Sequence, residues 1–232
     1  MRKLLYIYGT LLIAGILLSA CKKNYYVDTG IANPKYNGTI YDYLVKNPYL
    51  FDTVAYIVEK AGLKETLQND SITFFSPTDE SIGIAMNELN SYRYMMVEDS
   101  VRLGDIPGSV WKKFLERYIL PGKYKADRFA RIDPVNFYAY PGINYVMKNG
   151  YILNIGLIYQ DYNGVEAVGA RVLLLTDITF DPVTFLNNPS SVVASSDIQP
   201  TNGVMHALNT KHKFGFRPGE FLRVAEETLR NK

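Results

Sequence analysis

The sequence has very little of the side-chain chemistry on which most enzymes and metal proteins depend. Its 232 residues include one cysteine, Cys21, and two histidines, His206 and His212. A catalytic histidine needs a nucleophile or a carboxylate arranged around it, and a zinc site needs a full set of histidine, cysteine or carboxylate ligands. We therefore predict no catalytic, metal or cofactor site, and a protein that is not an enzyme.

The chain also lacks an excess of charge of either sign. It has 25 Lys and Arg against 23 Asp and Glu, and removing Arg2 and Lys3 with the first 20 residues leaves 23 of each. A neutral chain whose basic residues form only short pairs offers no footprint for nucleic acid. Adjacent carboxylates such as Asp79 and Glu80 do not face each other across a cleft, as glycoside hydrolysis would require.

The one long apolar run lies at the N-terminus. Arg2 and Lys3 precede "LLYIYGTLLIAGILLSA", which ends at Ala20. A membrane-spanning helix needs about 20 apolar residues with suitable flanks, and this run is slightly shorter, so a signal peptide fits better. The stretch "LSAC" resembles a bacterial lipobox, in which the cysteine becomes the acylated first residue. We expect residues 1–20 to be a lipoprotein signal peptide and Cys21 to carry the lipid, including palmitate.

The residues after Cys21 bear on the membrane that the lipid would occupy. A multiply acylated cysteine anchors a protein almost permanently. In lipoproteins of this kind an aspartate after the cysteine often signals retention in the inner membrane, and Lys22 stands there instead. This favours the outer membrane. Surface-exported lipoproteins of Bacteroidetes-like bacteria often have an acidic run here; "KKNYYVD" is not one, so the side of the membrane stays open.

Residues 21–38 have no apolar period and are interpreted as a lipidated tether. Thr39 and Asp42 then form a capping-box pattern, and the helix they begin should stop near Asn47 because Pro48 follows. A second helix should run from Pro48 to Gly62. Its inward face is predicted to hold the apolar residues at helical spacing, which are Leu50, Val54, Ile57, Val58 and Ala61.

The next stretch predicts alternation of strand and helix. Residues 72–75 are typical of a short buried strand, which Pro77 ends. Thr78 or Asp79 should cap a helix that continues to Leu89, followed by a loop over residues 90–108. Ser109 should cap another helix, and "LPG" at 120–122 should end it.

Two Asn-Gly pairs, 149–150 and 163–164, lie between β-rich runs. Asn-Gly is the strongest short-range signal for a hairpin, because both central residues of a type I′ turn need positive φ. We expect an antiparallel meander, a surface loop over residues 182–191, and a C-terminal amphipathic helix. The predicted inward residues of that helix are Phe221, Leu222, Ala225 and Leu229. This helix could cap the domain's own core or bind a partner.

Three stretches in order resemble the fasciclin domain family. "TFFSPTDESI" (73–82) resembles its first box, "LERYILPGKY" (115–124) its central segment, and "DIQPTNGVMHAL" (197–208) its second box. The resemblance implies a fasciclin-like domain over residues 39–210, with 211–232 as a C-terminal linker and short helix. It also implies an α+β fold, in which a β-sandwich or wedge of antiparallel strands is flanked by several α-helices.

The resemblance further implies a set of structural motif residues. They are Thr73, Phe75, Pro77, Thr78, Asp79, Pro121, Gly122, Asp197, Asn202, Gly203 and His206. His206 is thereby expected to hold the central sheet together as a satisfied buried residue. The central segment departs from the family, which usually has Tyr-His where Arg117 and Tyr118 stand. The integrin binding associated with that segment in animal matrix proteins is therefore not expected, and Tyr118 is interpreted as a core aromatic.

The aromatic-rich stretch "NFYAYPGINY" (136–145) permits two interpretations. The ordinary one is a strand that buries Phe137 and Ala139. The other is an exposed platform for a sugar or a protein on the opposite face, built from Tyr138 and Tyr140, since aromatic residues anchor interfaces.

We expect a non-enzymatic cell-envelope lipoprotein of the Bacteroidetes-like kind with a single fasciclin-like domain for adhesion or protein interaction. It would be lipid-anchored in the outer membrane through Cys21 and would bind a protein partner there. A specific form is an accessory subunit of an outer-membrane nutrient importer. The alternative is a glycan-binding accessory lipoprotein that uses exposed tyrosines, including Tyr138 and Tyr140.

Overall fold

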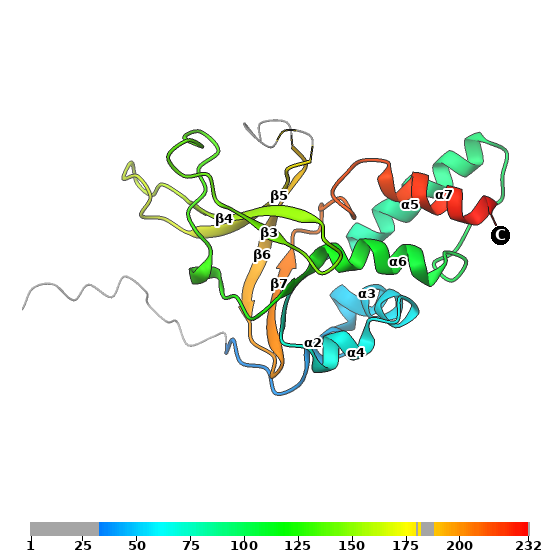
Figure 1. The fold of residues 1–232 in the computed structure, drawn as a ribbon, viewed down its shortest axis with the longest axis horizontal. Helices are drawn as coiled ribbons and strands as arrows, with labels where there is room; N and C mark the ends of the chain where they lie inside the picture. The colour runs from blue at the N-terminus through cyan, green and yellow to red at the C-terminus, as the bar shows by residue number, and fades with distance from the viewer. Residues whose placement is uncertain (1–32, 180, 182–187, 232) are drawn as a thin grey trace, which may run out of the picture. The chain divides into compact units, whose positions relative to one another are not determined.

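A computed structural model describes residues 33–179, 181 and 188–231 (Figure 1). Residues Pro34–Lys232 form one compact unit, distinct from Met1–Asn33. The predicted signal peptide, Cys21 and most of the tether therefore lie outside the described residues. The same holds for most of the surface loop predicted over residues 182–191, although Ser190 and Ser191 belong to a strand.

One seven-stranded mixed sheet runs through the domain in the order β2-β1-β7-β6-β5-β4-β3. Its strands are β1 (Ile72–Ser76), β2 (Ile119–Pro121), β3 (Ile143–Val146), β4 (Ile152–Tyr159), β5 (Arg171–Asp177), β6 (Ser190–Ile198) and β7 (Gly203–Leu208). β1 and β7 are parallel, whereas the other neighbouring pairs are antiparallel. The predicted meander is confirmed, since β3 to β7 pair in sequence order.

The two edge strands approach each other. The backbone N–H of Lys148, just after β3, donates to the carbonyl oxygen of Ile119 in β2 at 2.8 Å. This bond brings the sheet close to a closed barrel. The ladder is continuous through all seven strands, and the division into two packed layers of a sandwich or wedge stays a prediction.

Helices gather at the β1–β7 side of the sheet, while β3, β4 and β5 extend away from them (Figure 1). The helices of the described part are α2 (Ile40–Lys46), α3 (Pro48–Lys60), α4 (Lys64–Asn69), α5 (Asp79–Met95), α6 (Gly108–Leu115) and α7 (Glu220–Arg230). Short 3-10 turns cover Glu116–Tyr118 and Ala126–Arg128. The mixture of helices and a largely antiparallel sheet agrees with the predicted α+β class.

The start of the first two helices follows the prediction closely. Thr39 and Asp42 form a capping box, with both reciprocal hydrogen bonds present.

The prediction for Leu50 is wrong, because this side chain is 38% exposed. The backbone leaves helical geometry at Phe51 (φ −141°, ψ 15°). This kink directs Phe51 into the core in place of Leu50.

Helix α5 is longer than the apolar pattern predicted. It continues to Met95, so the predicted loop over residues 90–108 is wrong in its first part. The Asn90 side chain holds the segment that follows α5 against the helix. Its side chain accepts a hydrogen bond from the N–H of Val101 at 2.8 Å and donates to the carbonyl oxygen of Val101 at 3.0 Å.

The predicted bounds of the following helix are also wrong at both ends. Pro107 occupies the N-cap position and Ser109 lies inside α6. A Cβ on Gly108 would lie 2.2 Å from the carbonyl oxygen of Lys60, so close approach to α3 sets where this helix begins. The "LPG" stretch does not end the helix. Leu120 instead pairs with Thr73 in the β2–β1 ladder.

The two Asn-Gly hairpins differ in their turns. Asn163 and Gly164 both have positive φ, at 51° and 77°, as a type I′ turn requires. At the other pair only Gly150 has positive φ, at 80°. The Asn149 side chain accepts from the Tyr151 N–H at 3.0 Å and donates to the Lys113 carbonyl oxygen at 2.9 Å, which stabilises a different turn.

Helix α7 packs against the rest of the domain. The ring of Phe221 lies 5.1 Å from that of Trp111 and 5.4 Å from that of Phe114. Phe221 and Ala225 are buried, whereas Leu222 and Leu229 are partly buried against the same core. Of the two roles considered for this helix, the structure shows the capping of its own core.

Candidate functional site

The two boxes of the sequence motif meet at the β1–β7 pair. His206 in β7 is the direct ladder partner of Phe75 in β1. His206 is fully buried, and its Nδ1 accepts a hydrogen bond from the Asp197 N–H at 3.3 Å. Its Nε2 lies 3.0 Å from the Tyr124 carbonyl oxygen and must therefore be the protonated ring nitrogen. Burial lowers the pKa of His206, so the imidazole is neutral, and both of its ring nitrogens are hydrogen-bonded.

The first-box residues also make architectural contacts. Thr73 Oγ1 donates to the Gly122 carbonyl oxygen at 2.7 Å and accepts from the Tyr124 N–H at 2.8 Å. Thr78 caps α5, and Pro77 is buried directly before it. Pro121 is exposed at the end of β2.

Asp79 acts as a cap across space. Its two carboxylate oxygens each accept a backbone N–H, from Asp52 and from Val54, both at 3.0 Å. These N–H groups follow the kink at Phe51, where α3 restarts with unpaired donors. Burial, followed by the neighbouring Asp52, raises the pKa of Asp79 to about 6.

The second-box residues fasten the turn that enters β7. The Asn202 side chain accepts from the Ile40 N–H at 2.9 Å and donates to the carbonyl oxygens of Leu67 and Asp70 at 3.0 and 3.1 Å. A Cβ on Gly203 would lie 2.2 Å from the Ile72 carbonyl oxygen, so no larger residue fits. Together with Asp197, which accepts from the Ala126 N–H at 2.7 Å, these residues position backbone rather than a ligand.

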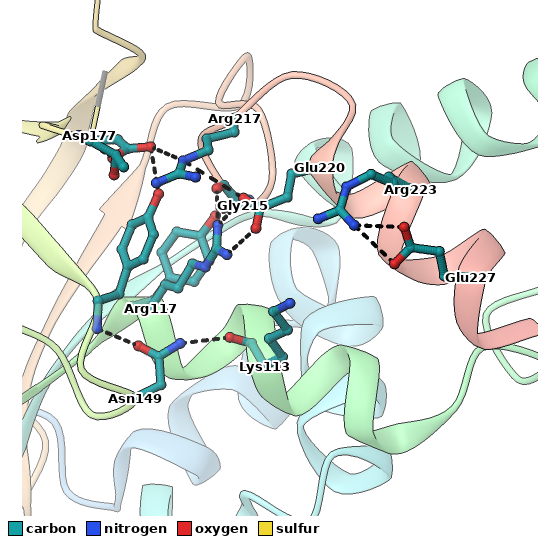
Figure 2. A network of polar contacts seen from close by, with 12 residues as sticks. Lys113, Arg117, Asn149, Asp177, Gly215, Arg217, Glu220, Arg223 and Glu227 are labelled. Carbon is teal, nitrogen blue, oxygen red and sulfur yellow. Dashed lines mark hydrogen bonds and ion pairs between the residues drawn. The ribbon is translucent and has the colours of Figure 1, made fainter. Parts of the chain in front are cut away.

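A second polar network lies where the C-terminal segment returns to the sheet (Figure 2). Arg117, which is 3% exposed, forms two hydrogen bonds of 2.7 Å with Glu220 and one of 2.8 Å with the Gly215 carbonyl oxygen. Arg217 donates to Asp177 at 2.8 Å, and the Tyr151 hydroxyl donates to the same carboxylate at 2.5 Å. The network therefore joins the 3-10 turn Glu116–Tyr118, β5 and α7.

Tyr118 and His212 form a buried pair next to that network. The Tyr118 hydroxyl accepts from the Gly215 N–H at 2.6 Å and therefore donates to His212 Nε2 at 2.7 Å. Burial lowers the pKa of His212 to about 3. Tyr118 is a core aromatic with no exposed surface, as its place in the apolar stripe predicted.

The aromatic stretch 136–145 does not form the predicted strand at its start. Asp133 Oδ1 accepts from the N–H groups of Val135 and Asn136 at 3.0 and 3.2 Å, which folds residues 133–140 into a turn. Ala139 is exposed and Phe137 is half-buried, so the predicted alternation is wrong. Tyr138 is 92% exposed and Tyr140 is 37% exposed.

The structure brings this turn beside a second hairpin. Residues 133–140 form a loop closed by the bond from the Asp133 N–H to the Tyr140 carbonyl oxygen, 2.9 Å, and residues 160–170 form a hairpin closed between Gln160 and Ala170, 3.0 Å. A cleft of about 440 Å³ lies between them. It is lined by Arg131, Ile132, Asp133, Val135, Asn136, Ile158, Tyr159, Asp161 and Glu166.

Arg131 organises the base of this cleft. Its guanidinium lies 3.9 Å from the centre of the Tyr140 ring and 5.4 Å from that of Tyr159. It also pairs with Asp133 at 3.2 Å. Hydrogen bonds from the Asn136 and Val135 N–H groups, with the Arg131 charge, hold the pKa of Asp133 below its usual value. The cleft therefore offers one fixed cation, stacked rings and acidic groups.

The two loops that border this cleft also bear exposed apolar side chains. We define the hairpin face as the five that stand on the two loops with more than half of their surface exposed: Val135, Tyr138, Tyr162, Val165 and Val168. Monomeric domains rarely expose large contiguous apolar groups without a binding role. A separate exposed group, the α5 tip, consists of Tyr94, Met95, Met96 and Val97 at the end of α5.

Sequence reasoning identified Tyr138 and Tyr140 but missed Arg131 and Tyr159. Arg131 precedes the loop by two residues, and Tyr159 ends β4. Their proximity depends on the backbone bonds between the Ile132 N–H and the Leu157 carbonyl oxygen, 2.9 Å, and between the Leu157 N–H and the Ala130 carbonyl oxygen, 2.8 Å. No local pattern in the sequence signals this pairing.

The described part of the chain has neither a cluster of metal ligands nor a membrane-spanning helix. Residues 33–179, 181 and 188–231 contain no group of three or more His, Cys, Asp or Glu side chains placed to hold a metal ion. Within the same ranges, no helix combines the length and the apolar character needed to cross a membrane.

Comparisons with known proteins identify the fold. No family model and no curated protein matches the sequence. Among solved structures, the chain is similar to a FAS1 domain pair from the insect cell adhesion molecule fasciclin I, with a TM-score of 0.51 and 13% identity. The match covers 80% of this chain and 52% of that structure, so the chain spans about half of its length. The fold is fasciclin-like.

Proposed function

We propose that this chain is a non-enzymatic cell-envelope lipoprotein whose fasciclin-like domain binds a protein partner through the hairpin face. The observation that carries the proposal is the exposure of Val135 (98%) and Tyr138 (92%) on one loop, next to the apolar residues of the neighbouring hairpin. The similar FAS1 pair belongs to a cell adhesion molecule, which supports an interaction role for the fold.

The energetics favour a protein partner. Burying an exposed valine or an aromatic side chain in an interface contributes about 1.5–3 kcal/mol, and a few aromatic or arginine anchors usually dominate binding. Tyr138 is such an anchor, and Arg131 supplies a cation that Tyr140 of the same loop and Asp133 already hold in place. The face thus combines an apolar centre with a preorganised polar group.

The anchor defines where the partner is expected. Acylation of Cys21 would restrict the domain to the surface of the outer membrane, so an integral protein of that membrane is the partner that it meets most often. The specific form that we propose is an accessory subunit of an outer-membrane nutrient importer.

The test is a pull-down of the acylated protein from mildly solubilised outer membranes, followed by mass spectrometry. We expect one stoichiometric membrane partner. Replacing Val135, Tyr138 and Val165 by serine should remove it. The matched control replaces three apolar residues of the α5 tip, Tyr94, Met95 and Val97, by serine and should retain it. A protein that is recovered alone, or a partner lost only with the α5 tip, would refute the proposed face.

Glycan binding is a second candidate function. The observation that favours it is the carboxylate-lined cleft, where Asp133, Asp161 and Glu166 lie near exposed tyrosines, since sugars bind through stacking and paired hydrogen bonds. Polysaccharide binding by the unacylated form, residues 22–232, is the test. Loss of that binding on changing Tyr138 and Tyr140 to alanine would support a glycan, and its absence in the unchanged protein would exclude one.

A further inference from the structure

A basic cleft lies where the chain from Cys21 enters the domain. It has a volume of about 400 Å³ and is lined by Lys35, Tyr36, Lys123, Lys125, Gln199, Pro200, Thr201, Gly203 and Val204. Three of the nine lining residues are lysines and none is acidic. This concentration of positive charge stands out because the chain after residue 20 has equal numbers of basic and acidic residues.

The backbone fixes this cleft to the entry point of the chain. The Gln199 N–H donates to the Pro34 carbonyl oxygen at 2.7 Å, and the Tyr36 N–H donates to the Gln199 carbonyl oxygen at 2.9 Å. The Thr201 N–H bonds to the Gly38 carbonyl oxygen at 2.9 Å. The first described residues, Lys35 among them, are therefore held along the turn between β6 and β7 (Figure 1).

Two of the lysines are available to an anion. Lys123 and Lys125 are exposed and form no ion pair with any carboxylate among the described residues. The Lys123 Nζ donates only to the Thr201 carbonyl oxygen, at 3.1 Å, which holds it over the cleft. Tyr36, Pro200 and Val204 also line the cleft.

We propose that this cleft binds the phosphate headgroups of anionic lipids in the membrane to which Cys21 is attached, and so holds the domain against that membrane. The proposal rests on the anchoring of the proposed function. Only the twelve residues 22–33 separate Cys21 from Pro34, and they span at most about 45 Å. The lipid is therefore always within reach, at an effective concentration that free phosphate does not match.

Two further features support a lipid surface. Lys22 and Lys23 directly follow Cys21, so the basic charge begins at the lipid itself. A lipid chain combined with a polybasic patch is a recognised pair of membrane signals. The 133–140 and 160–170 loops also stand at the opposite end of the sheet from the β6–β7 turn (Figure 1). A domain held by the cleft would keep the hairpin face directed away from the bilayer and open to a partner.

The test places a probe beside the cleft of the full acylated protein. Because Cys21 is the one cysteine and is acylated, Asn37→Cys supplies a single reactive thiol for a fluorophore at an exposed position next to Tyr36. Ser100→Cys is the distant control site. The protein is reconstituted in vesicles of phosphatidylethanolamine and phosphatidylglycerol, or of phosphatidylcholine, each with a nitroxide quencher on the lipid headgroup.

We expect strong quenching at position 37 in the phosphatidylglycerol vesicles, weak quenching there in phosphatidylcholine, and weak quenching at position 100 in both. Changing Lys35, Lys123 and Lys125 to glutamine should reduce the first signal to the phosphatidylcholine level, since each lysine contributes about fivefold to binding of an anionic surface. The matched control, glutamine at the exposed Lys46, Lys112 and Lys211, has the same net charge and should keep the signal.

Any one of the following results would overturn the proposal. Quenching that is equal in both vesicles, or that both lysine triples reduce equally, would show that the cleft has no specific role. Loss of quenching at position 37 when millimolar inorganic phosphate is added at constant ionic strength would assign the site to free phosphate. An intact mass without acyl groups would refute the anchor, whereas an acylated protein whose position 37 stays unquenched would refute the cleft alone.

Discussion

The imidazole of His206 lies face to face with the phenyl ring of Phe75, with ring centroids 5.1 Å apart and planes inclined by 19°. The two residues are direct partners in the parallel β1–β7 ladder. Each belongs to one of the two sequence boxes, which are separated by more than 100 residues. The two boxes therefore meet in one contact at the centre of the sheet, and loss of this contact should destabilise the whole domain.

Replacing His206 by alanine should reduce the free energy of unfolding by about 3 kcal/mol. The change leaves a cavity beside Phe75 and removes the partners of the Asp197 N–H and the Tyr124 carbonyl oxygen. Urea titration measures the effect. His206→Phe fills the volume but not the hydrogen bonds, and should recover only part of the loss. Wild-type stability in the alanine variant would contradict a structural role for this residue.

Stability should fall as the pH drops below about 6.5. Both histidines are held neutral in the fold, since burial lowers the pKa of His206 and lowers that of His212 to about 3. A histidine whose pKa is lower in the folded than in the unfolded state stabilises the fold at a pH above its unfolded pKa. This stabilisation is lost as the pH falls from the unfolded pKa through the folded pKa. His212 should contribute a slope of up to about 1.4 kcal/mol per pH unit as the pH falls below 6.5, and His206 should contribute in the same direction.

Asp79 works in the opposite direction between pH 6 and 4. Its raised pKa, about 6, means that its contribution is present at low pH and is lost as the pH rises through 6. It therefore offsets part of the histidine effect. Urea titrations of wild type and His212→Gln from pH 7 to 4 provide the check. The variant should show a shallower acid dependence, and identical slopes would refute the assignment to His212.

The Arg117–Glu220 pair should be costly to break from one side. Arg117→Met removes both 2.7 Å hydrogen bonds to the Glu220 carboxylate, which keeps only a longer contact of 3.9 Å with Arg217, and should cost about 3 kcal/mol. Burial opposes ionisation of Glu220, but the hydrogen bonds from Arg117 outweigh it and hold the pKa of Glu220 below its usual value. Adding Glu220→Leu to the Met variant removes the half-buried carboxylate that lost these hydrogen bonds and should restore part of the stability. Thermal unfolding of the two variants measures this recovery. If Arg117→Met destabilised the fold only through lost packing, Glu220→Leu would not raise the melting temperature.

Removing residues 218–232 should unfold the domain or lower its melting temperature severely. The deletion exposes the rings of Trp111 and Phe114, against which Phe221 packs. A milder test is Phe221→Ala, with an expected loss of about 3–5 kcal/mol. Its control is Glu227→Ala on the exposed face of the same helix, where the ion pair with Arg223 should contribute less than about 0.5 kcal/mol. An unchanged melting temperature after truncation would mean that α7 is not part of the core.

Local signals predicted the elements that local chemistry determines. The Thr39–Asp42 box and the Asn163-Gly164 turn depend on a few adjacent residues, and both are present as expected. The end of α5 and the identity of β2 were predicted wrongly because distant partners decide them. Asn90 holds the return loop, and Thr73 in β1 pairs with Leu120, which the helical pattern alone assigned to a helix end.

The candidate site was predictable only in part, for the same reason. Tyr138 and Tyr140 were visible as an aromatic cluster, but their neighbours come from another strand. Arg131 reaches the Tyr140 and Tyr159 rings only because the 130–132 segment pairs with Leu157 of β4. The apolar residues of the 160–170 hairpin complete the face, and a sequence gives no sign that two separate loops share one surface.

On the proposed function, the hairpin face docks a protein at the membrane. Site-specific photo-crosslinking in intact cells tests it most directly, with the crosslinker at position 138 of the hairpin face or at position 94 of the α5 tip. Both tyrosines are highly exposed, at 92% and 82%. We expect one discrete crosslinked membrane protein from position 138 and none from position 94. A product from position 94 alone, or from neither position, would contradict it.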